Sequence, residues 1–167
     1  NFFTALAQGQ KEIDLAVQKT TSQAKELAGL EQLEIVGIGT STFAGSPTNR
    51  RVNIKTGASA INGVLIKPGE EFSLIKALGK IDGTTGYLQE LVIKENKTTP
   101  EYGGGLCQIG TTLFRAVVNS GLPVTMRRNH SYRVAYYEPA GTDATIYDPL
   151  PDFRFMNDTG KALLLQT

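Results

Sequence analysis

The spacing of apolar residues predicts helices in two stretches of the chain and leaves a third stretch open. Between Gln108 and Ser120 apolar residues recur at four-residue steps, and Gly121 and Pro123 follow as helix stop signals. Between residues 10 and 30 they recur at three- and four-residue steps, with Lys and Glu in between. The period from residue 49 to residue 63 is only weakly helical, so this stretch is either a helix or a loop.

Short runs of apolar and β-branched residues predict strands in most of the remaining chain. Turn-forming residues such as Pro68 and Gly69 separate these runs, and residues 94–97 are expected at the tip of a hairpin. The predicted strands cover residues 33–43, 64–66, 91–93, 124–127, 132–137, 144–147, 153–156 and 162–166. Helices followed by a strand-rich end predict an α+β single domain, in which the helix near Cys107 packs on a mainly antiparallel sheet.

Length and charge narrow the classes of function. A chain of 167 residues has room for one ordinary domain, with or without a helical lead-in. Seventeen Lys+Arg and sixteen Asp+Glu give a net charge of +1, which provides no bulk attraction for nucleic acid or anionic lipid. No stretch approaches the ~20 apolar residues that a membrane-spanning helix needs. We therefore expect no nucleic-acid partner, and membrane contact only through an anchor upstream of this chain.

The single cysteine, Cys107, follows three glycines and directly precedes a predicted helix. A sulfur at a helix N-terminus lies beside unpaired N–H groups, and this environment favours the thiolate. The glycines at 103–105 would leave the backbone uncovered, so that N–H groups near Cys107 can form an oxyanion hole. A lone cysteine is more commonly a buried apolar residue, but its position at this loop-to-helix junction favours a nucleophile.

The only histidine, His130, can supply the base that a cysteine nucleophile needs near neutral pH. Asp143, just beyond the turn at residues 139–141, would accept the second imidazole N–H, and Asp148 is the competing candidate for that role. The order Cys, His, Asp along the chain also occurs in papain-like and transglutaminase-like folds, an analogy at the level of fold. One His and one Cys match no metal-site motif, so neither a metal nor another cofactor is expected.

Several blocks of the sequence resemble the VanW domain family, which is named from a vancomycin-resistance cluster. The central block is Gly-Gly-Gly-Leu-Cys-Gln-Ile-Gly-Thr-Thr-Leu-Phe at residues 103–114. Further blocks follow the family order, at residues 49–54, 66–73, 130–131, 141–145 and 152–157. The resemblance begins near Gly39, so we divide the chain into a helical lead-in or connector at residues 1–32 and a VanW-like domain at residues 33–167.

The resemblance implies a cell-wall-associated or membrane-anchored protein outside the cytoplasm of a Gram-positive-type bacterium. Some members of the family are understood to be L,D-transpeptidases, which use a cysteine to cross-link peptidoglycan stem peptides. The expected function is therefore cysteine-dependent acyl transfer on these peptides by a monomeric enzyme. The alternatives are a cysteine peptidase that hydrolyses cell-wall peptides with the same site, and a non-catalytic peptidoglycan-binding module in which Cys107 is buried.

Seven further residues are candidates for binding the peptide or stabilising the oxyanion. Arginine binds carboxylates through two parallel hydrogen bonds, although neighbouring arginines are more often solvated. Tyrosines can line a groove or pack in the core. The candidates are Gly104, Gly105, Gln108, Ser131, Arg50, Arg128 and Tyr132.

Overall fold

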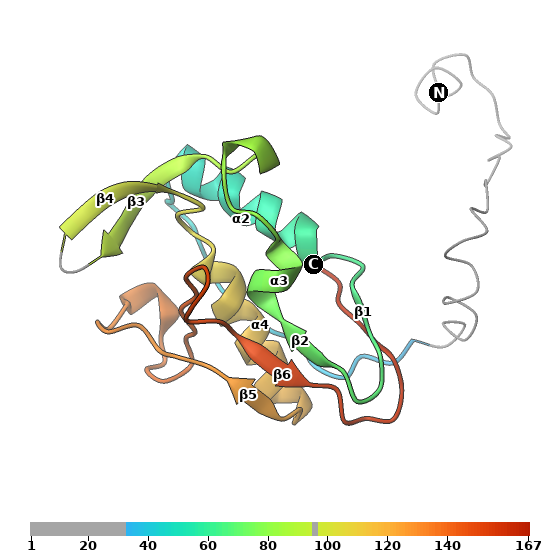
Figure 1. Ribbon diagram of the computed structural model, residues 1–167. Helices are drawn as coiled ribbons and strands as arrows, with labels where there is room; N and C mark the ends of the chain where they lie inside the picture. The colour runs from blue at the N-terminus through green and yellow to red at the C-terminus, as the bar shows by residue number, and fades with distance from the viewer. Residues whose placement is uncertain (1–32, 95–96) are drawn as a thin grey trace, which may run out of the picture. The chain divides into compact units, whose positions relative to one another are not determined.

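The computed structural model describes residues 33–94 and 97–167, which combine helices with antiparallel strands (Figure 1). This mixture confirms the predicted α+β class, and Ile35–Thr167 forms one compact unit. The helix predicted for residues 10–30, and with it the proposed lead-in, lies outside the described residues. None of the helices in the described part is long and apolar enough to cross a membrane.

Two of the described helices have 14 residues each. The first, α2, spans Thr48–Ile61, so the stretch that the sequence left open is a helix. The second, α4, spans Cys107–Ser120 and ends at Gly121, whose φ of 74° is the left-handed conformation that glycine adopts without strain. The shorter helices are α3 (Leu74–Leu78), η1 (Gly83–Thr85) and η2 (Ala135–Tyr137). The helix predicted from Gln108 is thus confirmed, and it begins one residue earlier, at the cysteine.

The described strands form three small antiparallel sheets instead of the one sheet that the sequence predicted. In the three-stranded sheet, β6 (Arg154–Met156) lies between β2 (Glu71–Ser73) and β5 (Val124–Met126). The two-stranded sheets pair β1 (Leu65–Ile66) with β7 (Leu163–Leu164), and β3 (Gln89–Lys94) with β4 (Lys97–Tyr102). Lys94 lies opposite Lys97, which confirms the predicted hairpin.

The prediction of a strand at residues 33–43 is wrong: the segment belongs to no strand and joins no sheet. It lies instead along α4, and a Cβ atom added at Gly39 would be 2.0 Å from the carbonyl oxygen of Thr112. Side chains of α4 bind its carbonyl groups, since Asn119 donates to Ile38 at 2.7 Å and Arg115 donates to Thr40 at 2.8 Å. Side chains of a helix therefore replace the neighbouring strand that the pattern of β-branched residues predicted.

Two other predicted strands are also absent from the described chain. Residues 132–137 form an irregular loop that ends in η2, whose last carbonyl accepts a hydrogen bond from Arg115. Residues 144–147 are extended but unpaired in any ladder, because the N–H of Thr145 donates to the carbonyl of Arg128 and that of Tyr147 donates to the carbonyl of Pro151. Both segments are held by individual hydrogen bonds to loops and side chains instead of a strand ladder, and both contribute residues to the site described next.

The hydrophobic core fixes the position of α4. One face of this helix buries Ile109, Leu113 and Val117. The same core contains Phe153 and Phe155, which are at most 1% exposed. Since α4 is anchored along its length, its first residue, Cys107, is held at a defined place at the edge of the core.

Candidate active site

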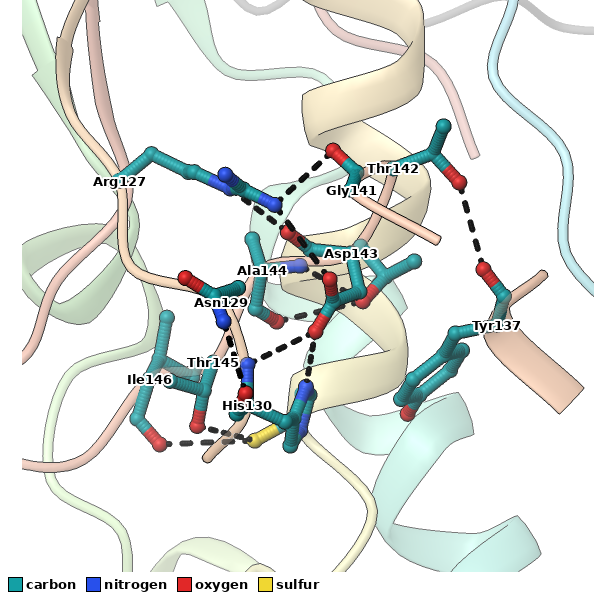
Figure 2. Close-up of polar contacts among 12 residues, drawn as sticks. Arg127, Asn129, His130, Tyr137, Gly141, Thr142, Asp143, Ala144, Thr145 and Ile146 are labelled. Carbon is teal, nitrogen blue, oxygen red and sulfur yellow. Dashed lines mark hydrogen bonds and ion pairs between the residues drawn. The ribbon is translucent and has the colours of Figure 1, made fainter. Parts of the chain in front are cut away.

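The sulfur of Cys107 lies at the start of α4 and contacts the extended segment 144–147. It is 3.5 Å from the hydroxyl of Thr145 and 3.6 Å from the carbonyl oxygen of Ile146, and Figure 2 shows both contacts on the yellow sulfur atom. It also interacts with the imidazole of His130. The residue is partly exposed, so the thiol is not sealed in the core.

His130 is bound by Asp143 through both its ring and its backbone. Nδ1 of His130 lies 2.6 Å from Oδ2 of Asp143, which also accepts the backbone N–H of His130 at 2.8 Å (Figure 2). Burial raises the pKa of the Asp143 carboxyl. The two hydrogen bonds and the charge of His130 lower it by more than burial raises it, so the net pKa lies below the ordinary value. An ionised carboxylate can only accept, so Nδ1 carries a proton and Nε2 is the nitrogen available to the thiol.

Arg127 fixes the carboxylate of Asp143 from the opposite side. Its guanidinium lies 3.3 Å from Oδ1 of Asp143 and donates to the backbone carbonyl of the same residue at 2.8 Å. Asp148, the competing candidate, is exposed. The structure thus brings Asp143 to the imidazole, while the catalytic roles of all three residues stay predictions.

The pKa values of the cysteine and the histidine are shifted toward each other. Burial raises the pKa of the Cys107 thiol, but hydrogen bonds with His130, Thr145 and the Ile146 carbonyl, and the charge of His130, outweigh it, so the net pKa is lowered. Burial lowers the pKa of His130, but Cys107 and Asp143 raise it by more. These shifts favour a thiolate–imidazolium pair, the reactive form of a cysteine nucleophile.

We expect the thiol of Cys107 to react with iodoacetamide at a lower pH than a free cysteine does. Alkylation needs the thiolate, so its rate rises with pH through the pKa of the thiol. His130→Ala removes a hydrogen bond and a positive charge that both lower this pKa. The rise should therefore move to higher pH in the variant. Identical profiles, measured by intact mass, would show that His130 does not interact with the thiol.

A cleft of about 870 Å³ opens in front of Cys107 and His130. Residues of the β3–β4 hairpin line this cleft, among them Val92, Pro100 and Tyr102. Residues of the loop at 128–137 also line it. Six of the seven residues predicted to bind the peptide or the oxyanion also line the cleft: Gly104, Gly105, Arg50, Arg128, Ser131 and Tyr132. This placement is compatible with binding an extended peptide, and the binding roles themselves stay predictions.

The glycines before Cys107 are required by packing as well as by conformation. Gly105 has a φ of 113°, and a Cβ atom added there would lie 2.8 Å from Cγ of Arg50. A Cβ atom at Gly104 would lie 2.8 Å from Cβ of Glu90. A side chain at either glycine would therefore collide with other protein atoms. The side on which it would lie is not open to a substrate. Within the described chain no acceptor takes the backbone N–H of Cys107, nor those of Gly104 and Gly105, so all three are candidate donors to an oxyanion, and that of Cys107 belongs to the nucleophile itself.

Gln108 is the predicted site residue that the cleft does not include. It is 2% exposed, and its amide oxygen accepts a hydrogen bond from Arg50 at 2.8 Å. Its amide nitrogen donates to the hydroxyl of Ser41 and to the carbonyl of Thr42. Gln108 therefore ties the segment before α2 to Arg50, which in turn lies on the cleft.

Sequence reasoning gave no role at the site to Thr145 and Ile146, and it considered Arg127 only as a carboxylate ligand and Tyr137 only as a groove-lining or packing residue. Thr145 belongs to the Gly-Thr-Asp-Ala-Thr block at residues 141–145, so the resemblance carried a signal for it. The other three act through a backbone carbonyl, a contact with Asp143 and a ring contact with His130. No local pattern reports such contacts. Among the residues that the structure describes, no group of His, Cys, Asp and Glu side chains could hold a metal ion.

Cys107 has a lowered pKa and interacts with a histidine that an aspartate binds. This arrangement defines a candidate cysteine-nucleophile site on an α+β fold. The chain belongs to the VanW family, because the family model described as "VanW like protein" matches residues 49–167. This confirms the resemblance seen in the sequence blocks.

Two curated relatives match the chain. It is 36% identical over 124 residues to "Uncharacterized protein YoaR" of Bacillus subtilis (strain 168), covering 74% of this chain and 41% of the relative. It is 35% identical over 116 residues to "Vancomycin B-type resistance protein VanW" of Enterococcus faecalis (strain ATCC 700802 / V583), covering 66% and 42%. The chain thus spans about two fifths of the length of these relatives. No solved structure matches it.

Proposed function

We propose that this protein is a cysteine acyltransferase that acts on peptidoglycan stem peptides, specifically an L,D-transpeptidase. It works as a monomer outside the cytoplasm, in the cell wall or anchored at the membrane through an upstream segment. The observation that carries the proposal is the arrangement of Cys107, His130 and Asp143 at a cleft large enough for a peptide. The relative named for vancomycin resistance supports a role in wall chemistry.

In the first half-reaction the thiolate of Cys107 attacks a carbonyl of the donor peptide. A carbon–sulfur bond forms, and the electron pair of the C=O bond moves to oxygen. When this oxyanion collapses, the carbon–nitrogen bond breaks and His130 gives its proton to the departing amine of a terminal D-amino acid. The product is a thioester on Cys107, and the imidazole is left neutral.

In the second half-reaction an amine of another stem peptide attacks the thioester. Neutral His130 accepts a proton from this amine, a new amide bond forms, and the carbon–sulfur bond breaks to restore the thiolate. The donor bond and the new bond are both amides, so the exchange needs no external energy source. Asp143 stabilises the imidazolium in both half-reactions because it stays ionised beside Nδ1.

Intact mass spectrometry after incubation with tetrapeptide-stem muropeptides tests the proposal. We expect an adduct on Cys107 equal to the muropeptide minus its terminal D-amino acid. Addition of an acceptor stem should discharge the adduct and give a cross-linked dimer. Release of the terminal residue without any dimer would indicate a peptidase. A protein whose Cys107 is alkylated only slowly and forms no adduct would be the binding module.

A further inference from the structure

Tyr137 is a buried tyrosine of the cleft. The sequence predicted at most that it lines a groove, and the proposed reaction has not yet used it. It is 3% exposed and lines the cleft together with Cys107. Its ring centroid lies 5.2 Å from that of His130, and Figure 2 shows the two side chains beside each other.

The hydroxyl of Tyr137 has a donor on one side and a free proton on the other. The guanidinium of Arg50 donates to its oxygen at 3.4 Å. Within residues 33–94 and 97–167 nothing accepts the hydroxyl proton. Burial and the nearby charge of Cys107 raise the pKa of Tyr137 far above its ordinary value, so the phenol stays protonated. The O–H of Tyr137 can therefore always donate a hydrogen bond. The positive charge of the Arg50 guanidinium beside its oxygen makes it a stronger donor.

The backbone of Tyr137 is fixed by the helix that carries the nucleophile. Its carbonyl accepts hydrogen bonds from Arg115 of α4 at 2.7 Å and from the hydroxyl of Thr142 at 3.3 Å. The side chain of Arg50, which holds the phenol, is itself held by Gln108, the residue after Cys107. Donors that are held in place before the reaction stabilise developing charge without reorganisation.

We infer that Tyr137 is a catalytic residue whose phenol donates a hydrogen bond to the oxyanion that forms when Cys107 attacks a carbonyl group. The backbone N–H of Cys107 is the second donor. The phenol keeps its proton throughout, and its hydrogen bond is released when the C=O bond re-forms. This inference rests on the proposed function, since only acylation of Cys107 creates the oxyanion.

Two reactions of the same thiol separate this role from a structural one. Acylation by p-nitrophenyl acetate passes through an oxyanion, whereas alkylation by iodoacetamide attacks a saturated carbon and creates none. For Tyr137→Phe we expect acylation of Cys107 to slow about 10²- to 10³-fold, the usual cost of losing one oxyanion donor. Alkylation should keep the wild-type rate and pH profile, because the variant retains the ring beside His130.

Tyr87→Phe is the matched control. Tyr87 is also a buried tyrosine, 2% exposed, and its hydroxyl has no partner within the described residues, but it lies outside the cleft. Both reactions should proceed at wild-type rates in this variant.

Three other outcomes would overturn the inference, and they are distinguishable. Wild-type acylation rates in Tyr137→Phe would remove the oxyanion role and leave the proposed function intact. An equal loss of acylation and alkylation, or a shifted alkylation profile, would mean that Tyr137 positions His130 and does not contact the oxyanion. If the wild-type protein is alkylated but is acylated neither by the ester nor by stem peptides, the proposed function fails and the role of Tyr137 fails with it.

Discussion

Cys107→Ala should give no thioester and no cross-linked product while the protein keeps its fold. The side chain is partly exposed, and the change to alanine removes only the sulfur atom with its contacts to Thr145, Ile146 and His130, so little packing is lost. Alanine also has the highest helix propensity, and position 107 begins α4. The reaction, in contrast, loses its only nucleophile. Chromatography of muropeptides after incubation measures the product, and thermal unfolding measures the fold.

Cys107→Ser is the stricter version of this experiment. A hydroxyl preserves the size and the hydrogen-bonding capacity of the thiol, but its far higher pKa leaves it un-ionised beside His130. We expect this variant to be inactive as well, with an unfolding temperature close to that of the wild type. Wild-type amounts of cross-linked product from either variant would contradict a cysteine mechanism.

Asp143→Asn should reduce the transpeptidation rate by orders of magnitude, about 10⁴-fold if the precedent of serine triads applies. Oδ2 of Asp143 accepts from both the ring and the backbone of His130, and its charge helps to raise the pKa of the imidazole. An amide has a similar shape but can present an N–H to Nδ1, which moves the ring proton to Nε2. His130 can then no longer accept a proton from the thiol. The initial rate of dimer formation measures the effect.

Asp148→Asn is the matched control for this substitution. Asp148 is exposed and lines the same cleft, so the change removes one carboxylate near the site while the contact between Asp143 and His130 stays intact. We expect the rate to stay near the wild-type value. A large loss in Asp148→Asn, with a near-normal rate in Asp143→Asn, would reverse the assignment of the orienting residue.

The sequence predicted those parts of the site that depend on local patterns. Cys107 was recognisable because the glycines and the helix that flank it are adjacent in the chain. The end of α4 was marked by Gly121, which adopts the left-handed conformation as expected. Asp143 was ranked ahead of Asp148 from a turn and a short sequence block, and the structure brings it to His130.

The sequence could not predict contacts that depend on distant parts of the chain. The β-branched residues of the 33–43 segment are typical of a strand, but the groups that bind its carbonyls are Arg115 and Asn119, more than 70 residues away. Gln108 is a sequence candidate for binding the peptide or stabilising the oxyanion, but the structure places it elsewhere. Successive residues of a helix point about 100° apart, so Gln108 faces the interior while Cys107 faces the cleft.

The close packing of the 33–43 segment on α4 also decides at which residue the domain should be cut when it is transferred into another protein. The family match starts at residue 49, whereas the compact unit starts at Ile35. A graft cut at residue 49 would omit Ser41 and Thr42, the partners of the buried Gln108 amide. An unsatisfied buried amide costs about 1–3 kcal/mol. The start of the family match thus falls inside the compact unit. A chimeric protein that keeps the site intact therefore needs residues 35–48 as well.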